Sequence, residues 1–358
     1  MNFIIISYRS LIILYCINQI KSERSIFGIY HLLTGKKSSQ TISDANLYQL
    51  AHLFSIFTQL KREELVQCVN DLCSKGLVTS NGENKYTLTT SGSQFLADML
   101  TEYPLPTYLN GWQYYDIGTD FWQRLSLCIQ VLSNVLYEKK NYITIEQDEK
   151  HLIWIKEFLF SKNITKEKLA TSIFQECKAC LSGLSDLEST IFVLRLSSFE
   201  RIGLTYKQIA LLLKQDETRI QLLFFNVLHF MLRKIESAPE EYRLLYEISN
   251  LSRRILTLTE STQKTFKLIQ EGKTIEEIVK VRGLKRNTIE DHIVEIAHNV
   301  KSFNISPYVS PSNLIKISKA QRDLQTMKLK PIKDHVGSDV SFFEIRLVLA
   351  RRGDYHEA

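Results

Sequence analysis

The sequence predicts a mainly α-helical protein in three parts, and three observations support this fold class. Apolar residues recur at helical spacing through most of the chain, and the pattern runs almost without interruption from residue 120 to 250. Only 13 glycines and 6 prolines occur among 358 residues, so few positions break a helix. The pattern of a β-hairpin is clear at one place, residues 77–88. We expect domains at residues 1–100, 101–250 and 251–358.

The composition and charge bound the possible functions. Hydrophobic residues make up 44% of the chain and charged residues 23%, which excludes a disordered or collagen-like protein. Lys and Arg number 45 against 39 Asp and Glu, which gives a net charge of +6. Such an excess permits an anionic partner without demonstrating one, because nucleic-acid binding depends on where the charge gathers.

The N-terminal segment 3–20 is strongly apolar, and we interpret it as a buried helix. Arg9 interrupts the apolar stretch, so the segment fits neither a signal peptide nor a membrane span. Six cysteines are scattered through apolar helical patterns, and Cys177 and Cys180 lack the second pair or the histidines that a zinc site needs. We therefore expect free thiols, a cytoplasmic location and no contact with a membrane.

Residues 22–100 have the pattern of a small domain with three helices and a hairpin. The first helix is expected to be capped by Ser22, to run through Ile26 to Leu33 and to end at Gly35, and the other two are expected at residues 44–54 and 61–74. Asn81-Gly82 then forms a tight turn between residues 77–80 and 85–88. This order predicts a winged-helix-like domain. Such domains serve DNA binding and protein docking alike, so the fold leaves both functions open.

The middle of the chain combines an aromatic run with a series of helices. Seven aromatic residues lie between 103 and 122, and no Lys or Arg occurs between Lys85 and Arg124. Packing is therefore a better interpretation than a stacking platform for single-stranded nucleic acid, which needs a basic groove. Helices are expected at residues 121–137, 148–160, 166–181, 186–197, 205–214, 219–235 and 242–254.

Residues 203–220 form a first candidate helix-turn-helix, whose spacing resembles region 4 of sigma factors. Its second helix is apolar nearly all round from Leu222 to Leu232, which is typical of a buried helix. Asp216 and Glu217 at the start of that helix would repel phosphate. We interpret this unit as a packing module rather than as a DNA-binding one.

Residues 273–293 form a second candidate, with Gly283 at the turn. The following helix carries an apolar stripe from Ile289 to Val300, which leaves the residues at its N-terminal end exposed. A recognition helix presents these positions to the major groove. The predicted DNA-contacting residues here are Lys285, Arg286, Asn287 and Thr288. A helical domain for protein contacts stays open, because residues 260–300 hold as many acidic as basic residues.

The C-terminal region is basic, with ten Lys and Arg against six Asp and Glu in residues 301–358. Most of the net charge of the chain therefore lies next to the second helix-turn-helix. The region either forms an extension that contacts the phosphate backbone or is a solvated surface. The candidate phosphate contacts are Lys328, Lys330, Lys333, Arg351 and Arg352.

Residues 265–293 resemble the helicase helix-turn-helix domain that occurs near the C-termini of RecQ-type helicases. The resemblance rests on the segment 265–278, on Arg282-Gly283-Leu284 and on the segment 288–293. The whole chain, with its ending Phe342–Ala350, resembles the YpbB family of Firmicutes, whose genes lie beside a RecQ-like helicase. This resemblance implies a RecQ-like helicase as partner and a role in DNA repair or recombination.

No catalytic motif is apparent in the sequence. Gly28 and Gly35-Lys36-Lys37 have the wrong spacing for a phosphate-binding loop, and no Ser or Thr follows the lysine. We expect no cofactor and no metal. The leading hypothesis is a cytoplasmic, non-enzymatic DNA-binding accessory protein of a RecQ-like helicase. The alternatives are a transcription regulator that uses the winged helix and a docking adaptor without DNA affinity.

Overall fold

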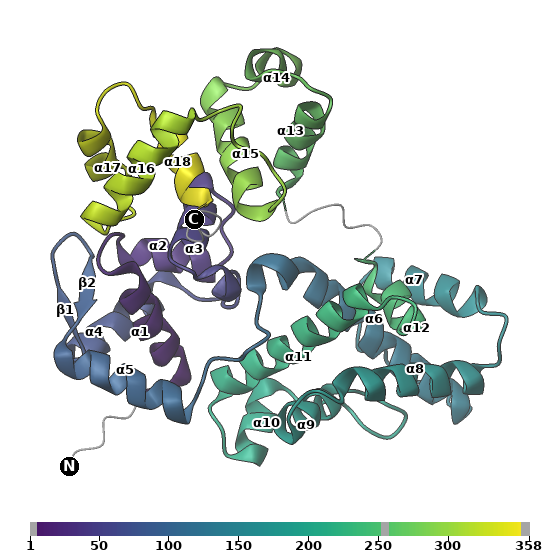
Figure 1. Ribbon diagram of the computed structural model, residues 1–358. Coiled ribbons are helices and arrows are strands. Elements are labelled where there is room, and N and C mark those ends of the chain that lie inside the picture. The colour runs from purple at the N-terminus through teal and green to yellow at the C-terminus, as the bar shows by residue number, and fades with distance from the viewer. Residues whose placement is uncertain (1–5, 252–257, 352–358) are drawn as a thin grey trace. The chain divides into compact units, whose positions relative to one another are not determined.

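The computed structural model describes residues 6–251 and 258–351, which form eighteen α-helices and one two-stranded sheet (Figure 1). The predicted fold class, mainly α, is confirmed. The chain forms two compact units. We call residues 1–12 with 97–255 the central unit, and residues 13–96 with 256–358 the terminal unit. The division into three independently folding domains, with boundaries near residues 100 and 250, stays a prediction.

The first half of the terminal unit has the predicted winged-helix-like order. The helix α1 (Tyr8–Ile20) begins in the central unit and is followed by α2 (Ile26–Leu33), α3 (Ser39–Leu47) and α4 (Arg62–Ser74). The strands β1 (Val78–Ser80) and β2 (Tyr86–Leu88) pair antiparallel, with Thr79 opposite Thr87. They are joined by residues 81–85 rather than by the two-residue turn that was predicted, and α5 (Thr90–Glu102) follows.

The predicted cap of the first helix, Ser22, is wrong, because α2 begins at Ile26 after Ser25 and Ser22 has a left-handed backbone with φ of 54°. The predicted bounds of the second helix, residues 44–54, are also wrong. The helix α3 begins at Ser39, because the side chain of Ser38 accepts a hydrogen bond from the backbone N–H of Thr41 at 3.2 Å. It ends at Leu47, and Gln49 then adopts a left-handed backbone with φ of 56°. A short 3-10 turn (Ala51–Leu53) follows, and the buried side chains of Leu50 and Phe54 lie at its two ends.

The central unit is a bundle of seven helices in the described residues, arranged around α11. They are α6 (Gly111–Leu136), α7 (Glu149–Phe160), α8 (Lys166–Leu181), α9 (Asp186–Arg195), α10 (Tyr206–Leu213), α11 (Glu217–Ser237) and α12 (Arg243–Ser249). The helices α6, α8, α9, α10 and α12 all pack on α11. As predicted, α11 is buried on nearly all sides, so the first helix-turn-helix has no second helix free to enter a DNA groove.

The aromatic run belongs to the core of the central unit. The helix α6 begins at Gly111, ten residues before the predicted start, because the side chain of Asn110 caps it. Trp122 packs edge-on against Phe192 and Phe224, and Tyr108 packs against Phe230 of α11. These rings are therefore used in packing and do not form an exposed stacking platform.

The second half of the terminal unit holds the second helix-turn-helix, which is formed by α14 and α15, and four further helices in the described residues. They are α13 (Glu260–Gln270), α14 (Ile275–Arg282), α15 (Arg286–Asn299), α16 (Pro311–Leu324), α17 (Leu329–Val336) and α18 (Phe342–Ala350). One core of isoleucine, leucine and valine side chains joins α14 and α15 to α16, α17 and α18. The basic C-terminal region is therefore folded as far as Arg351 and is not a separate extension there.

No helix in residues 6–251 or 258–351 combines the length and hydropathy that crossing a bilayer requires. Within the same ranges no three side chains of His, Cys, Asp or Glu gather into a group that could hold a metal ion. All six cysteines are free thiols.

Candidate nucleic-acid interface

The helix-turn-helix of α14 and α15 is built from local signals. The hydroxyl of Thr274 caps α14, and the carboxylate of Glu277 accepts a hydrogen bond from the Thr274 N–H at 2.8 Å in return. Gly283 ends the helix with φ of +60°, a conformation that glycine adopts without strain. Lys285 is then the N-terminal flanking residue of α15, whose Ile289 is fully buried. The turn thus places residues 285–288 at the start of the second helix.

The first turn of α15 is the accessible part of this helix. Lys285, Arg286 and Asn287 are exposed, and Thr288 is half-buried. Beyond Asp291, the residues from His292 to Ala297 are all buried. A surface for DNA on α15 is therefore limited to its N-terminal turn, which is the end of a recognition helix that reaches base edges.

Four helices cover the rest of α15. Its neighbours are α13, α14, α18 and, from the winged-helix-like half of the unit, α3. Arg346 of α18 links these elements, because its guanidinium is 2.6 Å from Asp291 and donates a hydrogen bond to Ser39 at 3.0 Å. The winged-helix-like segment thus packs directly on the second helix-turn-helix through α3.

Arg286 is held by two carboxylates in the free protein. Its guanidinium donates a hydrogen bond to Glu290 at 2.9 Å and another to Glu276 of α14. These hydrogen bonds, that to Glu276 first, raise the pKa of Arg286. Contact between Arg286 and a phosphate or a base therefore requires that both carboxylates give up the guanidinium. Lys285 forms no ion pair among the described residues, so the two cations are not equivalent.

Two buried polar networks fix α15 relative to α13, and sequence reasoning missed both. Glu295 is 6% exposed and accepts hydrogen bonds from the Thr259 N–H at 2.5 Å and the Thr262 hydroxyl at 2.7 Å. The ring of His292 lies 2.8 Å from the hydroxyl of Thr265. The sequence shows one signal, since the polar residues His292 and Glu295 lie among the apolar residues of α15. The threonines that bind them lie about 30 positions earlier in the chain, so the sequence does not identify these partners.

The basic C-terminal residues are used in different ways. Lys330 is exposed at the start of α17, and Lys328 is half-buried beside it. Lys333 donates to the carbonyl oxygens of Gly337 and Ser338 at 3.2 and 3.1 Å, and also to that of Val340. The ammonium group of Lys333 therefore closes the turn after α17.

Arg351 is 5% exposed and lies inside the fold. Its guanidinium donates to the carbonyl oxygen of Val300 at 2.8 Å and to that of Phe303, so it ties the end of α18 to the end of α15. Arg352 lies outside the described residues. We therefore keep Lys328 and Lys330 as candidate phosphate contacts and leave Lys333 and Arg351 out of the interface.

The net charge of the chain belongs to the terminal unit. That unit holds 25 Lys and Arg against 19 Asp and Glu, whereas the central unit holds 20 of each kind. The whole excess of +6 therefore lies in the unit that carries α15. Because phosphate attraction depends on local charge, this division favours the terminal unit as the side that meets an anionic polymer.

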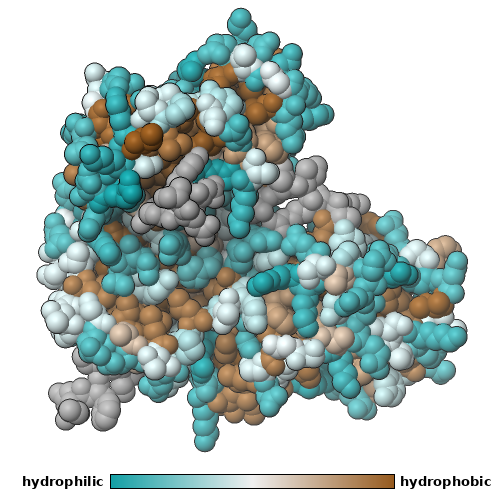
Figure 2. Space-filling view, in the orientation of Figure 1, coloured by the Kyte–Doolittle hydropathy of each residue, from teal (hydrophilic) through white to brown (hydrophobic). Residues whose placement is uncertain are grey.

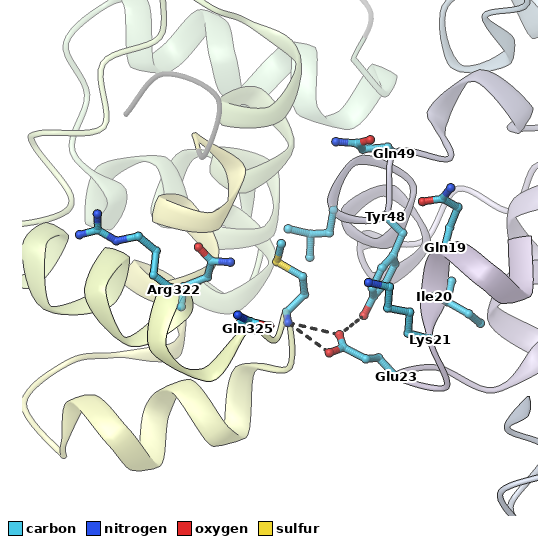
Figure 3. Close-up of a pocket in the computed structure, with 11 residues that line it drawn as sticks. Gln19, Ile20, Lys21, Glu23, Tyr48, Gln49, Arg322 and Gln325 are labelled. Atoms are coloured by element: carbon cyan, nitrogen blue, oxygen red, sulfur yellow. Dashed lines mark hydrogen bonds between the residues drawn. The ribbon is translucent and has the colours of Figure 1, made fainter. Parts of the chain in front are cut away.

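A cavity of about 490 Å³ also lies in the terminal unit, between α1, α3 and α16 (Figure 3). The Glu23 carboxylate joins its walls, since it accepts hydrogen bonds from the Tyr48 hydroxyl at 2.9 Å and the Thr326 hydroxyl at 2.7 Å. The helices α1, α3 and α16 all end at this cavity, so their carbonyl ends give it negative partial charge. The cavity is therefore a poor site for phosphate, despite Lys21 and Arg322 in its lining.

Comparisons with known proteins agree with this geometry. A family profile described as a helix-turn-helix domain matches residues 261–349, which suggests DNA binding. The chain is 35% identical over 349 residues to Protein YpbB of Bacillus subtilis (strain 168), and the match covers 97% of this chain and 98% of that protein. No solved structure matches the chain. On the length and identity of the match to that relative, the chain belongs to the YpbB family.

Proposed function

We propose that this protein is a non-enzymatic DNA-binding accessory protein, and that α15 contacts the DNA through its first turn. The observation that carries the proposal is the exposure of Lys285, Arg286 and Asn287 at the N-terminal end of the second helix of a helix-turn-helix. The amide of Asn287 has the donor and acceptor that pair with an adenine edge, and Lys285 is placed to contact a phosphate.

The further parts of the proposal rest on other grounds. A RecQ-like helicase as partner, and a role in DNA repair or recombination, come from the resemblance of the whole chain to the YpbB family, whose genes lie beside a RecQ-like helicase. The lack of a catalytic motif in the sequence supports a non-enzymatic role. The free thiols support a reducing, cytoplasmic location.

The winged-helix-like segment is a weaker candidate for the DNA contact. Its third helix, α4, is where a winged helix would read DNA, but this helix exposes Glu63, Glu64 and Asp71 beside Arg62. The acidic residues oppose the phosphate backbone. In addition, α3 packs on α15 and α18, so part of the segment is used inside the terminal unit.

Fluorescence anisotropy with labelled duplex, forked and single-stranded DNA tests the proposal. We expect binding that weakens with salt between 50 and 200 mM. In a plot of log affinity against log salt concentration, the slope for the Lys285→Ala variant should be shallower than that for the wild-type protein by about 0.9, which is the contribution of one phosphate contact. Arg286→Ala should have a smaller effect, because the carboxylates of Glu276 and Glu290 hold the guanidinium of Arg286 in the free protein.

The matched control is Lys61→Ala on α4, another exposed lysine at the start of a helix in the same unit. If this variant weakens binding and Lys285→Ala does not, the winged-helix-like segment is the DNA contact. If no DNA binds at low salt, while a purified RecQ-like helicase is retained by the immobilised protein, the protein is a docking adaptor instead.

A further inference from the structure

The helix α10 presents an apolar face that no other element of the central unit covers in the described residues 6–12 and 97–251. Leu211 is 73% exposed and Leu212 is 59% exposed, and both belong to this helix of eight residues. The opposite side of the same helix is packed on α11 through Ile209 and Ala210, which are buried. Ile202, in the loop that leads into α10, is 83% exposed. Leu211 and Leu212 are adjacent on one helix, and neighbouring exposed apolar side chains mark interaction surfaces.

The apolar face is flanked by positive charge. Lys207 and Leu211 are four residues apart, so they lie along one side of the helix, and Lys214 is the residue that ends it, with a left-handed backbone of φ 52°. Gln208 and Leu212 form the adjoining row. Both lysines are exposed, and neither forms an ion pair within the part of the chain that the structure describes. The helix itself contains no acidic residue. In Figure 2, hydrophobic surface at the lower edge, where Figure 1 draws α10, borders hydrophilic side chains.

We propose that this face of α10 is a docking site for an acidic amphipathic helix of a partner protein. The two leucines would take the apolar side of that helix, and Lys207 and Lys214 would meet its carboxylates. The charge of the face selects this partner over a neutral or basic helix, because like charges across an interface oppose binding. It also explains how the first helix-turn-helix is used, since its second helix is buried and its first helix keeps a free face.

This docking site is independent of the DNA contact, because it lies in the central unit and uses none of the residues at the start of α15. The two proposals can therefore fail separately, and measurements on the same purified full-length chain distinguish them.

The probe is a labelled synthetic helix with leucines along one side and glutamates along the other, titrated with the full-length protein. A second peptide carries lysines in place of the glutamates, and a third carries serines in place of the leucines. We expect the acidic leucine peptide to bind at least about tenfold more tightly than either of the others, because apolar anchors and charge complementarity are both needed.

The double substitution Leu211→Ser/Leu212→Ser should weaken binding of the acidic peptide by about tenfold or more. The matched control is Ile153→Ser/Phe160→Ser on α7, where the two apolar side chains are 48% and 92% exposed. A Lys207→Glu/Lys214→Glu variant should lose the acidic peptide and gain affinity for the basic one. Circular dichroism of each variant verifies that the helices are retained.

Equal affinity of wild-type protein for the acidic and basic peptides would overturn the proposal, as would unchanged binding by the leucine variant. Analytical ultracentrifugation of the wild-type protein tests the other possible partner of this face, a second copy of the chain. If the protein dimerises with concentration and the leucine variant does not, a second copy of the chain occupies the face and the proposed partner is wrong.

Discussion

Glu295 offers a sharp test of how α15 is held in place. Its carboxylate is buried and accepts three hydrogen bonds from the start of α13, two from Thr259 at 2.5 and 3.1 Å and one from Thr262 at 2.7 Å. The carboxylate thus caps α13 from a different helix. The Glu295→Ala substitution removes the acceptor and leaves the buried hydroxyl of Thr262 and the backbone N–H of Thr259 without it.

The magnitude follows from this count. A hydrogen bond to a charged group contributes about 1.5–3 kcal/mol, and a buried donor without an acceptor costs about 1–3 kcal/mol. Desolvation of the carboxylate in the wild-type protein offsets part of this gain. We therefore expect Glu295→Ala to lower the free energy of unfolding by about 2–4 kcal/mol. For a unit of about 150–250 residues, each kcal/mol shifts Tm by about 2–4 °C.

Differential scanning calorimetry measures the shift, with Glu271→Gln as the control because that carboxylate is exposed at the end of α13. The control should stay within about 0.5 kcal/mol of the wild-type protein. If the free energy of unfolding of Glu295→Ala also lies within about 0.5 kcal/mol of the wild-type value, the network does not hold α13 and α15 together. Our reasoning about the position of α15 then fails.

Three further predictions concern acid stability, backbone packing and DNA affinity. Burial lowers the pKa of His229 to about 3, so the central unit should lose stability as pH falls below about 6.5 towards 3, by up to about 1.4 kcal/mol per pH unit. His229→Asn keeps an acceptor for the backbone N–H of Asn110 and should reduce the loss of unfolding free energy per pH unit, as measured by urea titrations at several pH values. An unchanged pH dependence would show that His229 is not the group responsible. Gly92→Ala should lower the free energy of unfolding of the terminal unit by about 2 kcal/mol or more in urea titrations, because the added Cβ would lie 1.9 Å from the carbonyl oxygen of Leu77. An unchanged free energy of unfolding for this variant would contradict the packing. Glu276→Gln should raise affinity for duplex DNA about two- to fivefold at low salt by releasing the guanidinium on α15, and weaker binding would show that the carboxylate helps to orient it.

Local patterns in the sequence predicted much of the helical structure. The apolar residues all round α11 predicted its burial, and Gly283 predicted the turn before α15. Both features depend on residues close together in the chain. The start of α3 was predicted five residues too late, at residue 44, although the hydroxyl of Ser38 is a typical helix cap.

Contacts between distant segments could not be predicted in the same way. The stripe of apolar residues on α15 indicated one buried face, but the structure buries Val294 and Glu295 as well, because α3 and α18 cover the remaining sides. Lys333 and Arg351 were assigned to the DNA on the basis of charge alone. Their hydrogen-bond partners are backbone carbonyl oxygens, and no property of the side chains at those positions reveals them.

Site-specific cross-linking tests the central claim, that the first turn of α15 meets DNA, most directly. A photo-reactive amino acid replaces Asn287 in one sample and Asn70, an exposed asparagine on α4, in another. After irradiation with labelled duplex DNA, we predict a cross-linked product for position 287 that competing unlabelled DNA removes, and little product for position 70. Cross-links at position 70 without any at position 287 would contradict the account.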